Sequence, residues 1–311
     1  MTTPTAERAA AVAELAAARY AEQAAVSAGA SRLAAVAWRD LDTARIARSW
    51  LELVGTRLLA QVSAAQLAAA RGARGYVDRV LRVARGGRLR PAGHVVPERL
   101  AGVASDGRPL ETLLFQPALT TLREIESGRP VRESTVIGYA QLDMIVRTQV
   151  ADAGRMATGV EIAATPTLGY VRMVNPPACS RCVILAGRFY RWNSGFQRHP
   201  NCDCIHIPAA EASADDLTTD PRAYFDSLPE AEQDRIFTQA GAHAIRDGAD
   251  IGRVVNARRG LYTAGGRRLT REGTRRRGAR RVRLMPEQIY RDANGDRDEA
   301  IRLLRLHGYL A

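Results

Sequence analysis

The first 160 residues of the chain carry apolar side chains at helical spacing. Residues 5–28 are rich in alanine and end near Gly29, and residues 33–62 place larger apolar groups three to five positions apart, with Trp38 and Trp50 as anchors. This spacing predicts amphipathic helices. Three further helices are expected, at 76–85, about 110–126 and about 131–158. We therefore expect a helical bundle whose arginine-bearing faces are solvated or dock a partner.

The pattern changes near Pro166. Short segments with β-branched and aromatic residues, bounded by glycine or proline, predict three strands, at 168–174, 187–192 and 204–208. Together they indicate a small antiparallel sheet that carries the cysteines. Helices are expected again at 229–238, 239–256 and 296–310, and the last begins with acidic residues, as the helix dipole favours.

These elements predict an α+β fold. A mainly helical N-terminal region precedes a small α+β module with a cysteine-rich β-hairpin region, and a C-terminal helix ends the chain. The expected parts are a helical region at 1–160, the cysteine-containing module at 161–256, an arginine-rich flexible arm at 257–285 and the C-terminal helix at 286–311.

The composition of the chain also predicts its cellular compartment and the redox state of its cysteines. Residues 1–30 lack a basic start followed by an apolar block, and no stretch of 18 apolar residues occurs. We therefore expect a chain that stays in a cytosol, away from membranes, where thiols remain reduced. All four cysteines lie within 179–204, and under reducing conditions such a cluster favours metal ligands over disulfides.

The spacing of the cysteines fits a structural zinc site. A CxxC turn can present two thiolates to one ion, and a CxC pair on a strand offers two more. The expected ligands are Cys179, Cys182, Cys202 and Cys204, with His199 or His206 as a possible substitute for one of them. A pair of disulfides and unliganded cysteines in a packed hairpin are the alternatives. A catalytic metal is disfavoured because no glutamate base lies beside the cluster.

Positive charge is concentrated in one tract. All 45 cationic side chains are arginine, and residues 258–283 contain eleven of them with five glycines and a single acid. They are Arg258, Arg259, Arg267, Arg268, Arg271, Arg275, Arg276, Arg277, Arg280, Arg281 and Arg283. Low apolar content and frequent glycine predict a flexible or extended arm. It fits sequence-independent contact with a DNA backbone, although an acidic protein surface or plain solvation would also suit it.

Three common catalytic motifs are missing from the sequence. The chain has five histidines but no GxSxG elbow, HExxH pair or glycine-rich phosphate loop. A cysteine nucleophile with His199 is conceivable, yet neighbouring cysteines are more naturally ligands. Residues 240–256 only weakly resemble a helix-turn-helix, because no sign of a dimer accompanies them.

The cysteine region resembles the MuF-like minor head proteins of tailed bacteriophages. The family's second half reads HPxCxC, and the matching residues here are His199, Pro200, Cys202 and Cys204, after Cys179, Cys182 and Gly187 in the first half. The glycine commonly follows an aspartate, which is Ala186 here, so any role of that carboxylate is absent. The tail at 254–310 is similar to versions from phages of high-GC actinobacteria, and the resemblance spans about 165–310.

The resemblance implies a non-enzymatic minor capsid protein. Such proteins lie at low copy number inside the procapsid and virion head, assembled in the cytoplasm of the bacterial host. They associate with the portal and with capsid or scaffold proteins, and serve head morphogenesis and DNA packaging or ejection. The alternative is a capsid maturation protease that cleaves scaffold or coat protein, and a free nucleic-acid-binding regulator is a third hypothesis.

Overall fold

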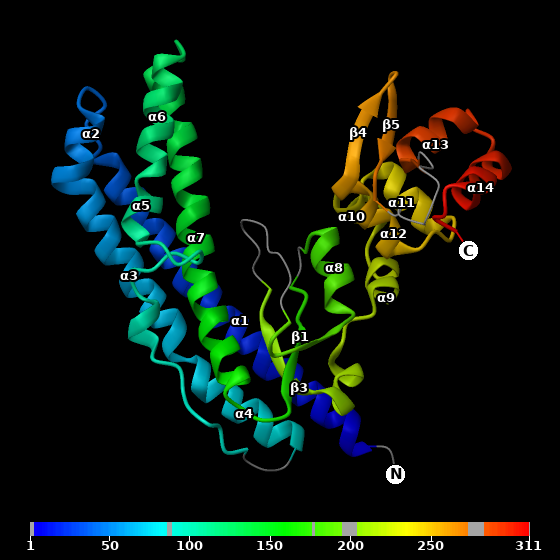
Figure 1. The fold of residues 1–311 in the computed structure, drawn as a ribbon, viewed down its shortest axis with the longest axis horizontal. Helices are drawn as coiled ribbons and strands as arrows, with labels where there is room; N and C mark the ends of the chain where they lie inside the picture. Colours follow the sequence, from blue (N-terminus) through cyan, green and yellow to red (C-terminus); the bar gives the residue numbers. More distant parts are fainter. Residues whose placement is uncertain (1–2, 86–88, 176–177, 195–203, 273–282, 311) are drawn as a thin grey trace. The chain divides into compact units, whose positions relative to one another are not determined.

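The computed structural model describes residues 3–85, 89–175, 178–194, 204–272 and 283–310 (Figure 1). The fold is α+β and mainly helical, with two small antiparallel sheets and a helix near the C-terminus. The chain forms two compact units. The helical unit comprises Met1–Met173 and Phe189–Leu217, and the C-terminal unit comprises Val174–Arg188 and Thr218–Ala311. These boundaries differ from the expected divisions after residues 160, 256 and 285, because the segment with Cys179 and Cys182 joins the C-terminal unit.

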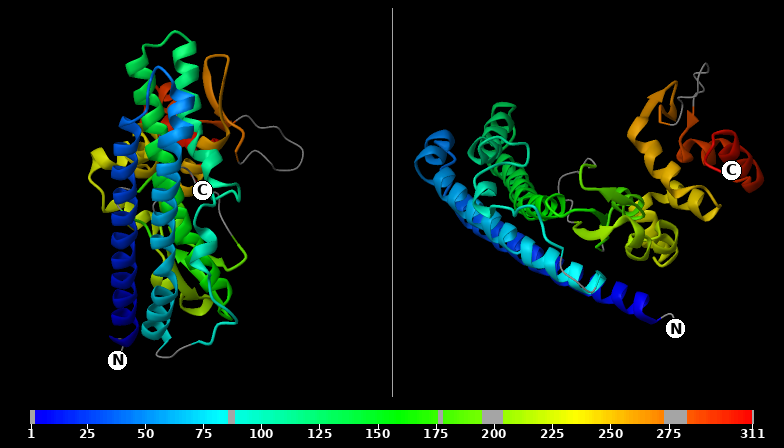
Figure 2. Two further views of the ribbon diagram at one scale, coloured as in Figure 1. Left: turned by 90° about the vertical axis from the view of Figure 1, so that its left-hand side faces the viewer. Right: turned by 60° about the horizontal axis from the view of Figure 1, so that its bottom comes forward.

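The helical unit contains most of the long helices. Its helical elements are α1 (Thr3–Arg39), α2 (Ile46–Ser49), the π-helical turn η1 (Trp50–Val54), α3 (Gly55–Arg71), α4 (Ala73–Arg85), the 3₁₀ turn η2 (Pro97–Leu100), α5 (Leu110–Leu114), α6 (Gln116–Glu126), α7 (Val131–Ala163) and the 3₁₀ turns η3 (Glu211–Ser213) and η4 (Asp215–Leu217). Its strands are β1 (Leu168–Arg172), β2 (Phe189–Arg191) and β3 (His206–Ala210). The bundle expected from the apolar spacing is confirmed, and α1, α3 and α7 run side by side in it (Figures 1 and 2).

The first helix does not end near Gly29, as the sequence pattern suggested. It continues to Arg39, because the buried residues Ala30, Ala34 and Ala37 extend its packed face. A glycine within a helix costs about 1 kcal/mol relative to alanine, which such packing readily offsets.

Two tryptophans anchor the core of the bundle, as the sequence predicts. Trp38 and Trp50 are buried with their rings edge to face and 6.3 Å apart, and Phe115 packs 5.9 Å from Trp50. Gly138 on α7 allows α6 to approach closely, because a Cβ at this position would lie 2.9 Å from the carbonyl oxygen of Pro117. The small side chain is therefore a packing requirement.

The three strands expected around residues 168–208 form an antiparallel sheet in the order β2-β1-β3. Tyr170 in the central strand lies opposite Tyr190 and Pro208. The sheet packs in the helical unit, where Tyr76 of α4 donates a hydrogen bond to the backbone oxygen of His206 at 3.0 Å. Cys179 and Cys182 are not part of this sheet. Because they begin a helix, the expectation that the sheet carries both cysteine pairs is not confirmed.

The C-terminal unit is built from short elements. They are α8 (Ser180–Ala186), α9 (Pro221–Asp226), α10 (Glu230–Phe237), α11 (Gln239–Arg246), α12 (Ile251–Ala257), η5 (Arg258–Gly260), β4 (Leu261–Ala264), β5 (Arg267–Thr270), β6 (Arg283–Leu284), α13 (Pro286–Ala293) and α14 (Arg297–Leu306). The helix expected at 239–256 is broken at Gly248, whose φ of 97° suits glycine. The helix expected at 296–310 is present as α14, and the region 286–311, expected to hold one C-terminal helix, also contains α13, separated from α14 at Asn294 and Gly295, which both adopt positive φ.

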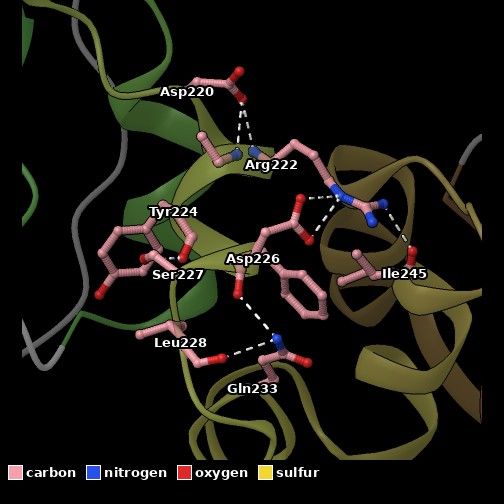
Figure 3. Close-up of polar contacts among 10 residues, drawn as sticks. Asp220, Arg222, Tyr224, Asp226, Ser227, Leu228, Gln233 and Ile245 are labelled. Carbon is pink, nitrogen blue, oxygen red and sulfur yellow. Dashed lines mark hydrogen bonds and ion pairs between the residues drawn. The ribbon is translucent and has the colours of Figure 1, made fainter.

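Side chains fix the short helices of this unit to one another (Figure 3). Asp220 caps α9 by accepting a hydrogen bond from the backbone nitrogen of Arg222 at 2.8 Å. The guanidinium of Arg222 donates to the backbone oxygen of Ile245, in α11, at 2.9 Å. Gln233 of α10 donates to the backbone oxygen of Leu228 at 3.0 Å. The first two bonds pair with backbone groups near the ends of α9 and α11, and the third ties α10 to the loop that precedes it.

Candidate metal centre and arginine surface

The first half of the predicted zinc site is a CxxC turn at the start of α8. Cys179 is the N-cap residue, and its Sγ accepts a hydrogen bond from the backbone nitrogen of Cys182 at 3.4 Å. The two Sγ atoms lie 3.3 Å apart, and the two cysteines are not joined by a disulfide. A disulfide would need about 2.05 Å. Two thiolates on one tetrahedral zinc lie about 3.8 Å apart, given Zn–S bonds of about 2.3 Å. A small adjustment of either side chain would thus meet the zinc geometry.

Packing around α8 holds this turn in place. Cys182 is buried, and Val183 and Ala186 are fully covered. The backbone nitrogen of Thr219 donates to the oxygen of Ala186 at 3.3 Å. A Cβ on Gly187 would lie 2.9 Å from the Cδ of Pro221, so this position requires a glycine for close approach. Ala186 is itself fully buried.

The second half of the predicted site is described only in part. Cys204 and His206 lie in the helical unit, where both are buried. Cys202 and the possible substitute His199 lie outside the described residues. Across the described ranges no group of three or more histidine, cysteine, aspartate or glutamate side chains could hold a metal ion. The structure therefore brings Cys179 and Cys182 together, and the complete four-cysteine site stays a prediction.

Part of the predicted arginine arm is a folded β-hairpin. Strands β4 and β5 pair antiparallel with Ala264 opposite Arg267, and Gly265 and Gly266 form the two-residue turn, both with positive φ. This is the conformation of a type I′ turn, for which Gly-Gly between two short strands is a recognised sequence pattern. That pattern was available in the sequence. The prediction of a wholly flexible or extended arm is therefore wrong for residues 258–272 and 283.

Acidic partners and backbone carbonyls hold several of these arginines. Arg258 pairs with Glu287 at 2.6 Å, and Arg267 pairs with Asp292, both on α13. Arg271 lies over the ring of Tyr262, 5.0 Å from its centroid. The backbone of Arg268 joins the hairpin to α13 through Gln288, while its side chain is exposed. The remaining candidates Arg275, Arg276, Arg277, Arg280 and Arg281 lie outside the described residues.

Arg283 anchors the end of the tract. Its guanidinium donates to the backbone oxygens of His307, Glu272 and Gly308 at 2.7, 3.2 and 3.3 Å. It also stacks on Tyr309, with the guanidinium carbon 3.9 Å from the ring centroid. Burial, followed by the nearby positive charge of Arg253, lowers the pKa of Arg283, and burial raises the pKa of Tyr309 to about 12. Arg283 therefore has a structural role.

A histidine–carboxylate pair in the helical unit was not found from the sequence. The Nδ1 of His94 lies 3.1 Å from a carboxylate oxygen of Glu161, whose side chain is almost fully buried. Both line a pocket of about 480 Å³. The described lining of this pocket contributes no serine or cysteine, and the hydroxyl of Thr165 is bonded to a backbone oxygen. His94 and Glu161 are 67 positions apart in the sequence, and no local sequence pattern links residues at that distance.

No protein-family model, curated protein or solved structure matches the chain. None of the helices in the described part of the chain is both long enough and apolar enough to cross a bilayer.

Proposed function

We propose that this chain is a MuF-like minor capsid protein of a tailed phage. It would lie inside the procapsid with the portal and with capsid or scaffold proteins, assist head morphogenesis and DNA packaging or ejection, and catalyse no reaction. The observation that carries the proposal is the CxxC turn at the start of α8, whose two sulfurs lie 3.3 Å apart within the segment that resembles this family. The tight packing at Gly187 supports the same correspondence.

Within this proposal, zinc has a structural role. Cys179, Cys182, Cys202 and Cys204 would hold the ion, and four thiolates close a tetrahedral site to substrate. Such an ion stabilises a small module that has little core of its own. The basic tract of the C-terminal unit would contact packaged DNA.

The test of the zinc site is elemental analysis of the purified chain. We expect about one zinc per chain in the wild type and a large loss of zinc in Cys202→Ser. Ser180→Ala is the matched control, because it lies between the first two cysteines and leaves all four sulfurs in place. A wild type that is free of metal and equally stable in a chelator would contradict the zinc site.

The test of the wider function is to separate heads and procapsids on a density gradient and to analyse them by mass spectrometry. We expect peptides of this chain at low copy number in both fractions, and their absence would contradict the proposal. Incubation of the purified chain with procapsids distinguishes the alternative function. Trimmed scaffold or coat protein would favour a maturation protease, whereas intact proteins are expected of a non-enzymatic component.

A further inference from the structure

A pocket of about 470 Å³ in the C-terminal unit is lined largely by arginine. Its lining includes Arg181 and Arg188 from the α8 segment, Arg253 from α12, and Arg259 and Arg283 from the basic tract. Only two of these five, Arg259 and Arg283, belong to the basic tract at 258–283. Folding therefore adds arginines from distant parts of the chain to the basic surface.

Acidic groups do not neutralise this pocket. Among the described residues, the lining contains two acids, Asp250 and Glu272, against the five arginines. A carboxylate oxygen of Asp250 accepts a hydrogen bond from the backbone nitrogen of Arg253 at 2.7 Å and so caps α12. Glu272 is 3.9 Å from Arg259, a distant and partly exposed pair. A net positive charge thus remains in a partly enclosed space.

The arginines of the pocket have different roles. Arg283 is held by three backbone carbonyls, and Arg253 donates to the backbone oxygen of Gly308 at 3.0 Å, so both help to build the wall. Arg188 is exposed and, among the residues that the structure describes, forms neither a hydrogen bond nor an ion pair. A charged side chain without a partner beside other cations is available for an anion.

Apolar side chains in the pocket lining strengthen the attraction between the arginines and an anion. Ile184 and Leu185 of α8 line it and are nearly covered. A low-dielectric surface beneath charged groups increases their attraction for an opposite charge. Guanidinium groups bind phosphate oxygens in two-point contacts, and several arginines around one space suit a group with several anionic oxygens.

We propose that this pocket seats a phosphate group of the DNA backbone, with Arg188 and Arg181 as the contacting side chains. Arg253 and Arg259 complete the positive wall. This inference rests on the proposed function only for the choice of DNA as the source of the phosphate. The phosphate site itself does not depend on that choice, because any accessible phosphate group could occupy it.

The test is fluorescence anisotropy of a short labelled duplex with the full-length chain across a range of salt concentrations. The variant is Arg181→Gln with Arg188→Gln. The matched control is Arg291→Gln with Arg305→Gln, which removes the same charge from exposed sites outside the pocket. Each phosphate contact contributes about −0.9 to the slope of log K against log salt, which is worth about eightfold in affinity near 0.1 M salt.

We expect the pocket variant to lose at least about tenfold in affinity near 0.1 M salt and to have a slope shallower by about 2. The control should stay within about twofold of the wild type, since it loses only long-range attraction. Arg188→Gln alone, which breaks no contact within the fold, should show about half of the slope change. Equal losses in the pocket variant and the control, or an unchanged slope, would overturn the pocket while leaving DNA contact to the tract.

A second measurement separates the pocket from the source of its phosphate. If the wild type binds no duplex, calorimetric titration with inorganic pyrophosphate tests the pocket directly. Binding that is lost in Arg188→Gln would keep the phosphate site and assign it to a small ligand. Absence of binding to both probes would overturn the inference. Incorporation of the chain into heads is measured independently, so its failure is distinguishable from failure of the pocket.

Discussion

Replacing Arg283 by methionine tests whether this arginine stabilises the C-terminal unit. The guanidinium bonds to three backbone oxygens and stacks on Tyr309, whose hydroxyl donates to the oxygen of Leu284 at 2.9 Å. These contacts join β6 to the turn that follows α14. Methionine keeps much of the apolar volume of the stem but removes every one of the donors.

The expected loss of stability follows from these contacts. A hydrogen bond to a charged donor contributes about 1.5–3 kcal/mol when buried, and a stacked cation about 0.5–2 kcal/mol. The side chain of Arg283 is only partly buried, so water can replace some of the bonds, and the variant also avoids the cost of desolvating the guanidinium. We therefore expect a net loss of about 2 kcal/mol, well below the simple sum.

The assay must report on the C-terminal unit alone. All three tryptophans, Trp38, Trp50 and Trp192, belong to the helical unit, so their fluorescence follows the unfolding of that unit. Hydrogen–deuterium exchange with mass spectrometry can instead follow peptides of α13 and α14. A loss of 2 kcal/mol corresponds to about 30-fold faster exchange of amides that open with the unit. The midpoint of unfolding measured by tryptophan fluorescence should not change.

Arg291→Met on α13 is the control for this measurement. Arg291 is exposed, and among the described residues its side chain forms no hydrogen bond or ion pair. We expect its exchange to match the wild type. Equal exchange in Arg283→Met and Arg291→Met would refute the structural role of Arg283, because the backbone carbonyls would then be satisfied equally well by water.

Two further predictions concern pH and packing. Burial lowers the pKa of His307, whose Nδ1 accepts a hydrogen bond from the backbone nitrogen of Leu284, so the folded state binds this proton less readily than the unfolded state does. Stability should therefore fall as the pH drops below about 6.5, and exchange in His307→Asn should lose that component of the pH dependence. Gly138→Ala should lower the free energy of unfolding of the helical unit, followed by tryptophan fluorescence, by about 1–2 kcal/mol. The reason is that the added Cβ would lie 2.9 Å from the oxygen of Pro117. Gly159→Ala, on the same helix and with open space around its Cβ, should gain about 0.5–1 kcal/mol, and opposite signs for the two variants are the check.

The apolar spacing was sufficient to predict most of the helical unit. The long helix α7 and the strands near residues 168, 189 and 206 were expected at about these places, and the helix expected at 110–126 is present as the two helices α5 and α6. Periodicity identifies an element because its buried face must be apolar whatever it packs against. Periodicity did not predict where each element ends. The helix α1 continues through Gly29 because the alanines that follow it are packed.

The candidate site was predicted less completely. A CxxC turn is local, so its two thiols could be brought together by the sequence itself, and they are 3.3 Å apart. The Gly-Gly hairpin is also local, and composition alone wrongly suggested a flexible arm there. Arg188 and Arg253 are far apart in sequence and share no periodicity, so no pattern could place them in one pocket.

The sequence by itself determined the helical character of the chain, its small sheet, its paired thiols and its concentration of arginine. These properties depend on local backbone preference and on residues a few positions apart. Only the tertiary structure decided that the CxxC helix belongs with the C-terminal unit, that Arg283 is structural and that Arg188 faces a basic pocket. Those outcomes depend on which surfaces pack together, and packing between distant segments is not encoded in the spacing of any one of them.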